Sequence, residues 1–212
     1  MPPSARPNNN LDDPRNITGA ISYDKAINAA LSDTGVKGLK EVLDFEFYDS
    51  TTVANGASTT TNLFAAASTD IATSNFIGAG VMPTGQALLI QTMRVVFAPS
   101  CTVADMQALQ LGVSLSLVLE NSKKYAEGLA MQFPCGYGPG VQSFSGITTP
   151  TAGASMGTNG LPAINNVFRF RRPVTLHAQQ PFKVALTRLA PTMAATTRVF
   201  VFLGGVYVRN VL

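Results

Sequence analysis

One short segment of the sequence has the pattern of a hydrolytic nucleophile. Residues 153–157 read GASMG, which matches the nucleophile elbow of hydrolases around Ser155. Such an elbow needs a strand before it, a helix after it, and an acid and a histidine later in the chain. The flanking residues are threonine, glycine and proline, and no acidic residue follows Ser155. We therefore interpret this segment as a glycine- and serine-rich loop.

The histidine and cysteine content limits metal and thiol chemistry. His177 is the only histidine among the 212 residues, so a multi-histidine metal site is excluded. Cys101 and Cys135 are too few for a disulfide framework, and we expect two small buried thiols. A cysteine–histidine pair would need an orienting partner and closeness in space, which the sequence does not indicate. We expect no enzymatic activity, no cofactor and no small-molecule substrate.

Two carboxylates lie two residues apart in an alternating segment. Asp44 and Glu46 alternate with Leu43, Phe45 and Phe47. In a strand this spacing places both carboxylates on one face, about 7 Å apart. Paired carboxylates can hydrolyse glycosidic bonds. On a half-exposed strand, however, we expect them to keep the sheet edge soluble.

The most distinctive polar cluster is basic. Alternation from Phe168 to Arg171 places Arg169 and Arg171 on the face opposite the two phenylalanines, and Arg172 follows at a turn. Three interpretations stay open: a solvated face, pairing with acids of a neighbouring subunit, or contact with nucleic-acid phosphates.

Charge is scarce and unevenly distributed along the chain. Charged residues make up 13% of the sequence, against about 25% in ordinary globular proteins. Glu127 is the last acidic residue, and seven arginines and lysines follow it. The candidate partners of Arg169, Arg171 and Arg172 are Asp44 and Glu46, in the same or an adjacent subunit. We predict these five residues as subunit contacts.

The hydrophobic pattern predicts mainly strands. Apolar residues alternate most clearly over Leu111–Leu119. Further strands are predicted at Leu43–Phe47, Asn62–Ala67, Phe76–Met82, Leu88–Phe97, Val167–Arg171, Val174–His177, Phe182–Arg188 and Arg198–Arg209. A capping box at Thr102 predicts a helix to about Gln110, and Ser22–Leu31 is a second short helix. Strands without alternating helices favour an all-β antiparallel sandwich of about eight strands.

Two predicted strands are apolar on both faces. Leu88–Phe97 and Val199–Leu203 lack the alternation of a strand with one wet face. Each is therefore either central under a loop or covered by another subunit.

The remaining segments suggest one domain with an arm. Residues 1–20 are rich in Pro, Asn and Asp and carry equal numbers of acidic and basic side chains, as expected of a flexible arm. Residues 21–212 form the predicted single domain, with a long uncharged loop at about 136–162. The start has no apolar signal segment, and the run Val199–Val208 is about half the length of a membrane helix. We expect synthesis and assembly in a cytoplasm.

The pattern of strands resembles a known family. The closing run Pro173–Arg209, with its strand, tight turn, strand, loop and strand, is similar to that of single jelly-roll capsid proteins of viruses, especially tailless or lipid-containing bacteriophages. The segment from Lys124 to Gly136 shares this similarity, and the resemblance covers about residues 40–212. It implies an eight-stranded antiparallel jelly roll and a structural subunit of an icosahedral capsid, located in the virion.

The resemblance also implies partners. These are copies of the chain itself and other capsid proteins. Capsid proteins of small RNA viruses often carry a basic arm, whereas residues 1–20 are neutral. A separately packaged genome or an internal membrane inside the shell fits this arm better than genome packaging by the arm itself. The alternative function is a receptor- or carbohydrate-binding jelly-roll module, such as a spike or fibre head, although the chain has no tryptophan for sugar stacking.

Overall fold

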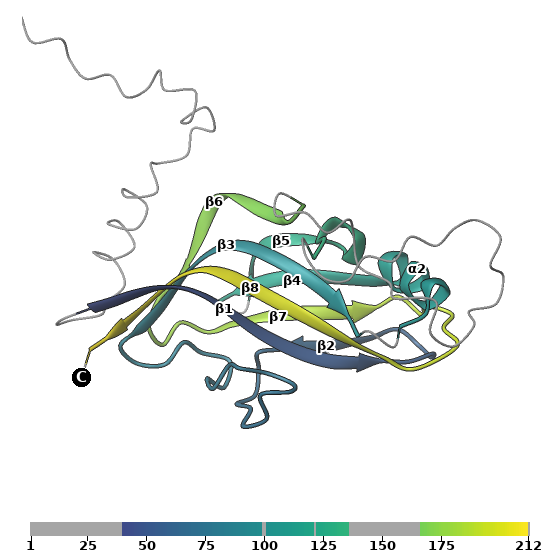
Figure 1. Ribbon diagram of the computed structural model, residues 1–212, viewed down its shortest axis with the longest axis horizontal. Helices are drawn as coiled ribbons and strands as arrows, with labels where there is room; N and C mark the ends of the chain where they lie inside the picture. The colour runs from purple at the N-terminus through teal and green to yellow at the C-terminus, as the bar shows by residue number, and fades with distance from the viewer. Residues whose placement is uncertain (1–39, 99–100, 121, 136–165, 212) are drawn as a thin grey trace, which may run out of the picture.

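The computed structural model describes residues 40–98, 101–120, 122–135 and 166–211 (Figure 1). The predicted arm 1–20, the helix Ser22–Leu31, the loop at 136–162 and Ser155 lie outside the described residues.

Eight strands account for most of the described chain. Their bounds are β1 Lys40–Val53, β2 Thr59–Leu63, β3 Gln86–Phe97, β4 Val113–Leu119, β5 Lys123–Leu129, β6 Phe168–Leu176, β7 Phe182–Arg188 and β8 Thr197–Asn210. One α-helix, α2 at Val103–Gly112, and one 3-10 turn, η3 at Ala130–Gln132, lie between β3 and β6. The prediction of a mostly β, antiparallel sandwich is confirmed.

The strands form two antiparallel four-stranded sheets that face each other (Figure 1). Sheet 1 has the order β1-β8-β3-β6, and sheet 2 has the order β2-β7-β4-β5. The first strand pairs with the eighth, the second with the seventh, the third with the sixth and the fourth with the fifth. The chain is therefore arranged as one long hairpin that is folded over into two layers.

The core lies between the two sheets. In β4, Val113, Leu115 and Leu117 are buried, whereas Ser114 and Ser116 are half-buried on the outer face of sheet 2. The predicted alternation is confirmed from Val113 to Leu117, whereas Leu111, which was predicted as part of the strand, lies in α2 and is exposed. Full burial of each such aliphatic side chain contributes roughly 1.5–3 kcal/mol.

Some predicted elements differ from the structure. Phe76–Met82 is not a strand: both end residues are buried, but only Val81 forms a bridge, with Pro181. The two segments predicted at Val167–Arg171 and Val174–His177 are one strand, β6. β5 was not predicted, because its lysines and glutamate made it look like an exposed connection. Such charges are typical of an edge strand, which β5 is.

The helix α2 begins at the predicted cap, but the Asp105 side chain binds a segment distant in the sequence instead of reaching back to Thr102. Thr102 caps it, since its hydroxyl accepts a hydrogen bond from the Asp105 N–H at 3.1 Å. The Asp105 carboxylate accepts from the Ala194 N–H at 2.6 Å, so it ties α2 to the segment before β8.

The two strands with apolar residues on both faces are the central pair of sheet 1. β8 lies between β1 and β3 along its whole length, and β3 lies between β8 and β6. Both strands are therefore central in sheet 1, which is part of one of the two arrangements that the sequence left open.

Two glycines allow the strands of sheet 1 to approach closely. The register of β3 shifts between Ile90 and Thr92, where it faces Gly205 and Gly204. A Cβ atom on Gly205 would lie 1.9 Å from the Leu89 carbonyl oxygen, and one on Gly204 would lie 2.6 Å from the Thr92 hydroxyl. The irregular pairing of β3 with β8 therefore requires residues without side chains at these positions.

We predict that Gly205→Ala destabilises the fold, because the added carbon meets backbone that cannot rotate away. The free energy of unfolding should fall by about 1–3 kcal/mol, the usual range for overpacking. Urea unfolding followed by circular dichroism measures it. Ser116→Thr, which adds one methyl group to the outer face of sheet 2, is the control and should change stability by less than about 0.5 kcal/mol. Equal midpoints for the two variants would contradict the close approach.

Candidate functional site

All five residues predicted as subunit contacts lie on sheet 1, at opposite edges. Asp44 and Glu46 are on β1, and Arg169, Arg171 and Arg172 are on β6. The strands β8 and β3 separate these edges, at about 4.8 Å per strand step. The structure therefore does not bring the two groups together in one subunit, and it gives Glu46 a different partner.

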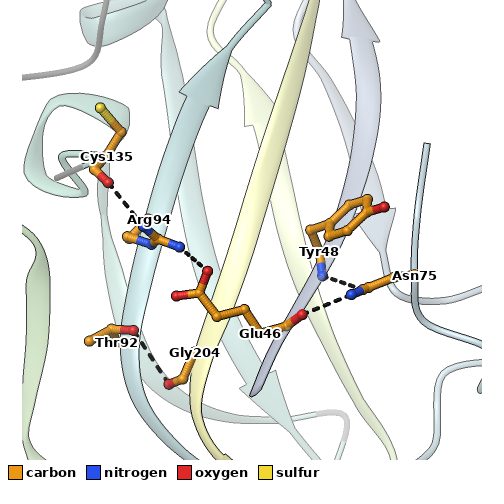
Figure 2. Close-up of polar contacts among 7 residues, drawn as sticks. All are labelled: Glu46, Tyr48, Asn75, Thr92, Arg94, Cys135 and Gly204. Atoms are coloured by element: carbon orange, nitrogen blue, oxygen red, sulfur yellow. Dashed lines mark hydrogen bonds and ion pairs between the residues drawn. The ribbon is translucent and has the colours of Figure 1, made fainter. Parts of the chain in front are cut away.

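The partner of Glu46 is Arg94 of β3. The Arg94 Nη2 atom donates to the Glu46 carboxylate across β8 (Figure 2). Gly204 lies between them on β8 and has no side chain in the way. The Arg94 Nη1 atom donates to the Cys135 carbonyl at 3.2 Å, and the guanidinium lies 5.3 Å from the centroid of the Phe202 ring. One cation thus joins β1, β8, β3 and the segment after η3.

Burial makes this ion pair unlike the other ion pairs of the described chain. The Arg94 residue is 5% exposed, whereas the Glu46 side chain is 44% exposed. A charge removed from water is costly unless a counter-charge, hydrogen bonds and polarisable neighbours replace the water. Carboxylate, carbonyl and aromatic ring supply these three for Arg94.

The outer face of sheet 1 is largely apolar around this pair. By register, Val206 and Val208 of β8 and Leu89 of β3 point away from the core, yet all three are buried. Phe200 and Phe202 lie on the same face and are half-buried. Sheet 1 therefore presents an apolar exterior with one internally compensated ion pair in it.

The free edge of β1 is blocked by a side chain. Asn75 accepts from the Tyr48 N–H through Oδ1 at 2.7 Å and donates through Nδ2 to the Glu46 carbonyl at 2.8 Å (Figure 2). Its own N–H donates to the Tyr48 carbonyl at 3.2 Å. Asn75 thus takes the place of a neighbouring strand and satisfies backbone groups that would otherwise attract one.

The loop that contains Asn75 carries two exposed isoleucines. Ile71 is 76% exposed and Ile77 is 66% exposed. The Tyr48 hydroxyl donates to the Ile71 carbonyl, and the Ser50 hydroxyl donates to the Thr73 carbonyl at 2.8 Å. The loop is therefore fixed on β1 while Ile71 and Ile77 face solvent.

The basic residues of β6 lie where the sequence predicted them. Arg169, Arg171 and Arg172 are exposed. Phe168 packs on Phe133 and Phe170, with ring centroids 4.9 and 5.1 Å away. The alternation of inward phenylalanines and outward arginines is confirmed.

β6 also departs from regular pairing at these residues. Thr92 of β3 faces Arg169, and Ile90 faces Val174. Three residues of β3 therefore face six residues of β6, so Arg171 and Arg172 lie on a bulge at the sheet edge.

The remaining candidates for chemistry are two cysteines and one histidine. Cys101 and Cys135 are buried and form no disulfide, and burial raises the pKa of the Cys101 thiol, which makes it a weaker nucleophile at neutral pH. His177 lies at the turn after β6, where its N–H donates to the Gln180 side chain at 2.9 Å. Among the described residues, no group of three or more histidine, cysteine, aspartate or glutamate side chains could hold a metal ion. Within the same residues no helix is long and apolar enough to span a membrane.

Comparisons with known proteins give no relative. No protein-family model matches the chain, and no curated protein matches it.

Two residues of this surface were missed by sequence reasoning. Arg94 is the one charged residue within the apolar strand β3, a position that requires a buried counter-charge, and this signal was available. Asn75 lies in a polar loop with no periodicity, and nothing in the sequence indicates that it faces β1.

We predict that the Glu46–Arg94 pair is strongly coupled. In a double-mutant cycle with Glu46→Gln and Arg94→Met, the coupling energy should be about 1–3 kcal/mol, as for contacting buried partners. The control is the exposed pair of Glu41 and Arg209, which joins the neighbouring strands β1 and β8 at their ends, whereas Glu46 of β1 and Arg94 of β3 pair across β8. Its cycle should give a coupling several-fold smaller. Equal couplings would mean that burial of Arg94 does not strengthen the pair.

We predict that Asn75→Ala opens the edge of β1. The amide of Tyr48 loses its acceptor, so its hydrogen exchange should accelerate by at least about tenfold, equivalent to about 1.4 kcal/mol of local stability. Mass spectrometry of exchanged peptides measures this rate. Asn62→Ala, an exposed asparagine on β2, is the control and should leave Tyr48 protected. Unchanged exchange in the Asn75 variant would show that the loop backbone alone covers the edge.

Proposed function

We propose that this chain is a jelly-roll capsid protein of a bacteriophage-like virus, a structural subunit that assembles with copies of itself into an icosahedral shell. The observation that carries the proposal is the strand order. A jelly roll is a double-sheet arrangement of eight antiparallel strands, common in viral capsids. The nested pairing of β1 with β8, β2 with β7, β3 with β6 and β4 with β5 is what a rolled-up hairpin requires.

A fold does not by itself determine a function, so the surface has to support the proposal. The outer face of sheet 1 is apolar, and only 13% of the residues are charged. A soluble monomer rarely exposes large apolar patches, and such patches usually mark interfaces. On this face Leu89, Val206 and Val208 are already buried within the subunit, so Phe200 and Phe202, which are half-buried, are the side chains that we propose neighbouring subunits cover.

The fixed loop on β1 is a second candidate contact between subunits. Its isoleucines, Ile71 and Ile77, are exposed, yet the loop is held by hydrogen bonds to Tyr48 and Ser50. A preordered loop loses little conformational entropy when it binds. We propose that these side chains enter an apolar surface of the adjacent copy.

The role we propose is structural and not catalytic. In this view the buried thiols of the described chain serve packing, and His177 serves turn formation. Copies of the chain and further capsid proteins are its proposed partners, and the virion is its proposed location after assembly in the host cytoplasm.

We predict that the purified full chain forms capsomers or closed shells. Light scattering after gel filtration and negative-stain electron microscopy measure the size and shape of the particles. The variant Ile71→Asp with Ile77→Asp should raise the threshold concentration for assembly at least about tenfold, since each buried isoleucine contributes roughly 1.5–3 kcal/mol. Its melting temperature should stay near that of the wild type.

The matched control places the same charges elsewhere. Thr60→Asp with Asn62→Asp adds two carboxylates to exposed positions of β2 and should assemble like the wild type. A small discrete oligomer that does not grow with concentration would reject the shell subunit. If that oligomer also binds a glycan or a cell-surface receptor, the chain is instead a receptor-binding jelly-roll module.

A further inference from the structure

We infer that the β6 edge, defined by Arg169, Arg171 and Arg172, binds the phosphate backbone of a nucleic acid. The inference rests on and deepens the proposed function, because it assigns the shell subunit a polyanionic partner.

The described carboxylates that could neutralise these arginines already have partners. The described residues contain eight acidic side chains: Glu41, Asp44, Glu46, Asp49, Asp70, Asp105, Glu120 and Glu127. Four of them form ion pairs with Arg209, Arg94, Lys123 and Lys124. Asp49, Asp70 and Asp105 accept hydrogen bonds from backbone N–H groups, and Asp44 is not free either. Each described acid is thus already engaged inside its own subunit.

The three arginines of the β6 edge are all exposed. Within the described chain, no carboxylate forms an ion pair with Arg169, Arg171 or Arg172. The described acids of a neighbouring copy would be engaged in the same way, and pairing with Glu46 would require Arg94 to lose its buried counter-charge. An external anion is therefore a better partner for the β6 edge than a second copy of sheet 1.

The spacing of the arginines and the bulge of β6 determine the shape of this edge. Arg169 and Arg171 are two residues apart on one face, about 6.6 Å along the strand. The bulge carries Arg172 and opens this edge, because six residues of β6 face three of β3. Phe168 and Phe170 fix the backbone from the core side. The result is a short row of guanidinium groups, each able to bind a phosphate with two parallel hydrogen bonds.

The number of charges favours a nucleic acid over a membrane surface. Polybasic sites for anionic lipids usually gather four to eight lysines or arginines, whereas the β6 edge has three. The described phenylalanines beside them face the core, so no base-stacking platform accompanies the arginines. Binding should therefore be independent of sequence, weak for one subunit and strengthened when many subunits contact one strand.

The test uses the full chain and a fluorescent thirty-nucleotide oligothymidine as the probe. Anisotropy titrations at several salt concentrations should give a slope of log affinity against log salt of about −2, the value for three phosphate contacts on a single strand. Arg169→Gln with Arg171→Gln should weaken binding at least about tenfold at low salt and make the slope less steep by about 1.4. Electron microscopy should show that the variant still assembles normal empty particles.

The control removes two positive charges from other strands. Lys183→Gln with Arg198→Gln should retain nearly all binding, since these residues lie on β7 and β8. Equal losses in both variants would overturn the assignment and indicate attraction by net charge alone. A wild type that does not bind the probe would overturn it as well.

Two further outcomes separate this inference from its alternatives. Binding to vesicles that contain phosphatidylserine, without binding to oligothymidine, would overturn it in favour of a lipid surface. Loss of assembly with unchanged oligothymidine binding would overturn it in favour of a subunit contact. A wild type that binds the probe through β6 but forms no particles would reject the proposed shell function and leave the site standing.

Discussion

The position of β8 between β1 and β3 is the constraint on which the rest of sheet 1 depends. β8 supplies the two glycines over which its neighbours approach, and only this approach lets Glu46 reach Arg94. That ion pair in turn holds the segment after η3 through the Cys135 carbonyl. Burial of a cation on the outside of this sheet is tolerated because its carboxylate and aromatic partners lie on β1 and β8 and its carbonyl partner lies in the segment after η3.

The acidic and basic side chains of the described chain have different roles. The described acids neutralise cations, cap turns or bind backbone N–H groups within the subunit, so they act mainly in folding. The surplus positive charge is carried by strand side chains that face away from the core. It is most dense at the β6 edge. Stability and recognition can therefore be changed by separate substitutions in this protein.

The strands could be predicted where the pattern was strong, which means alternation in β4 and β7 and long apolar runs in β3 and β8. β5 was hidden because an edge strand with lysines has the composition of a loop, and Phe76–Met82 looked like a strand because an irregular segment can also bury large side chains. The outward direction of Arg169 and Arg171 followed from alternation with Phe168 and Phe170. The partner of Glu46 could not be predicted, because it depends on which strand lies two positions away in the sheet.

The nested pairing of the strands also orders events during synthesis. Lys40 pairs with Asn210, and every other residue of β1 also pairs with β8. This pairing cannot form until β8 has left the ribosome. Only the β4–β5 hairpin joins neighbouring strands that can form early. Such distant pairing makes folding slow, because long loops must close before contacts compensate for them. A chain that stops before β8 would lack the centre of sheet 1 and the Glu46–Arg94 geometry together, so incomplete subunits would be kept out of any assembly.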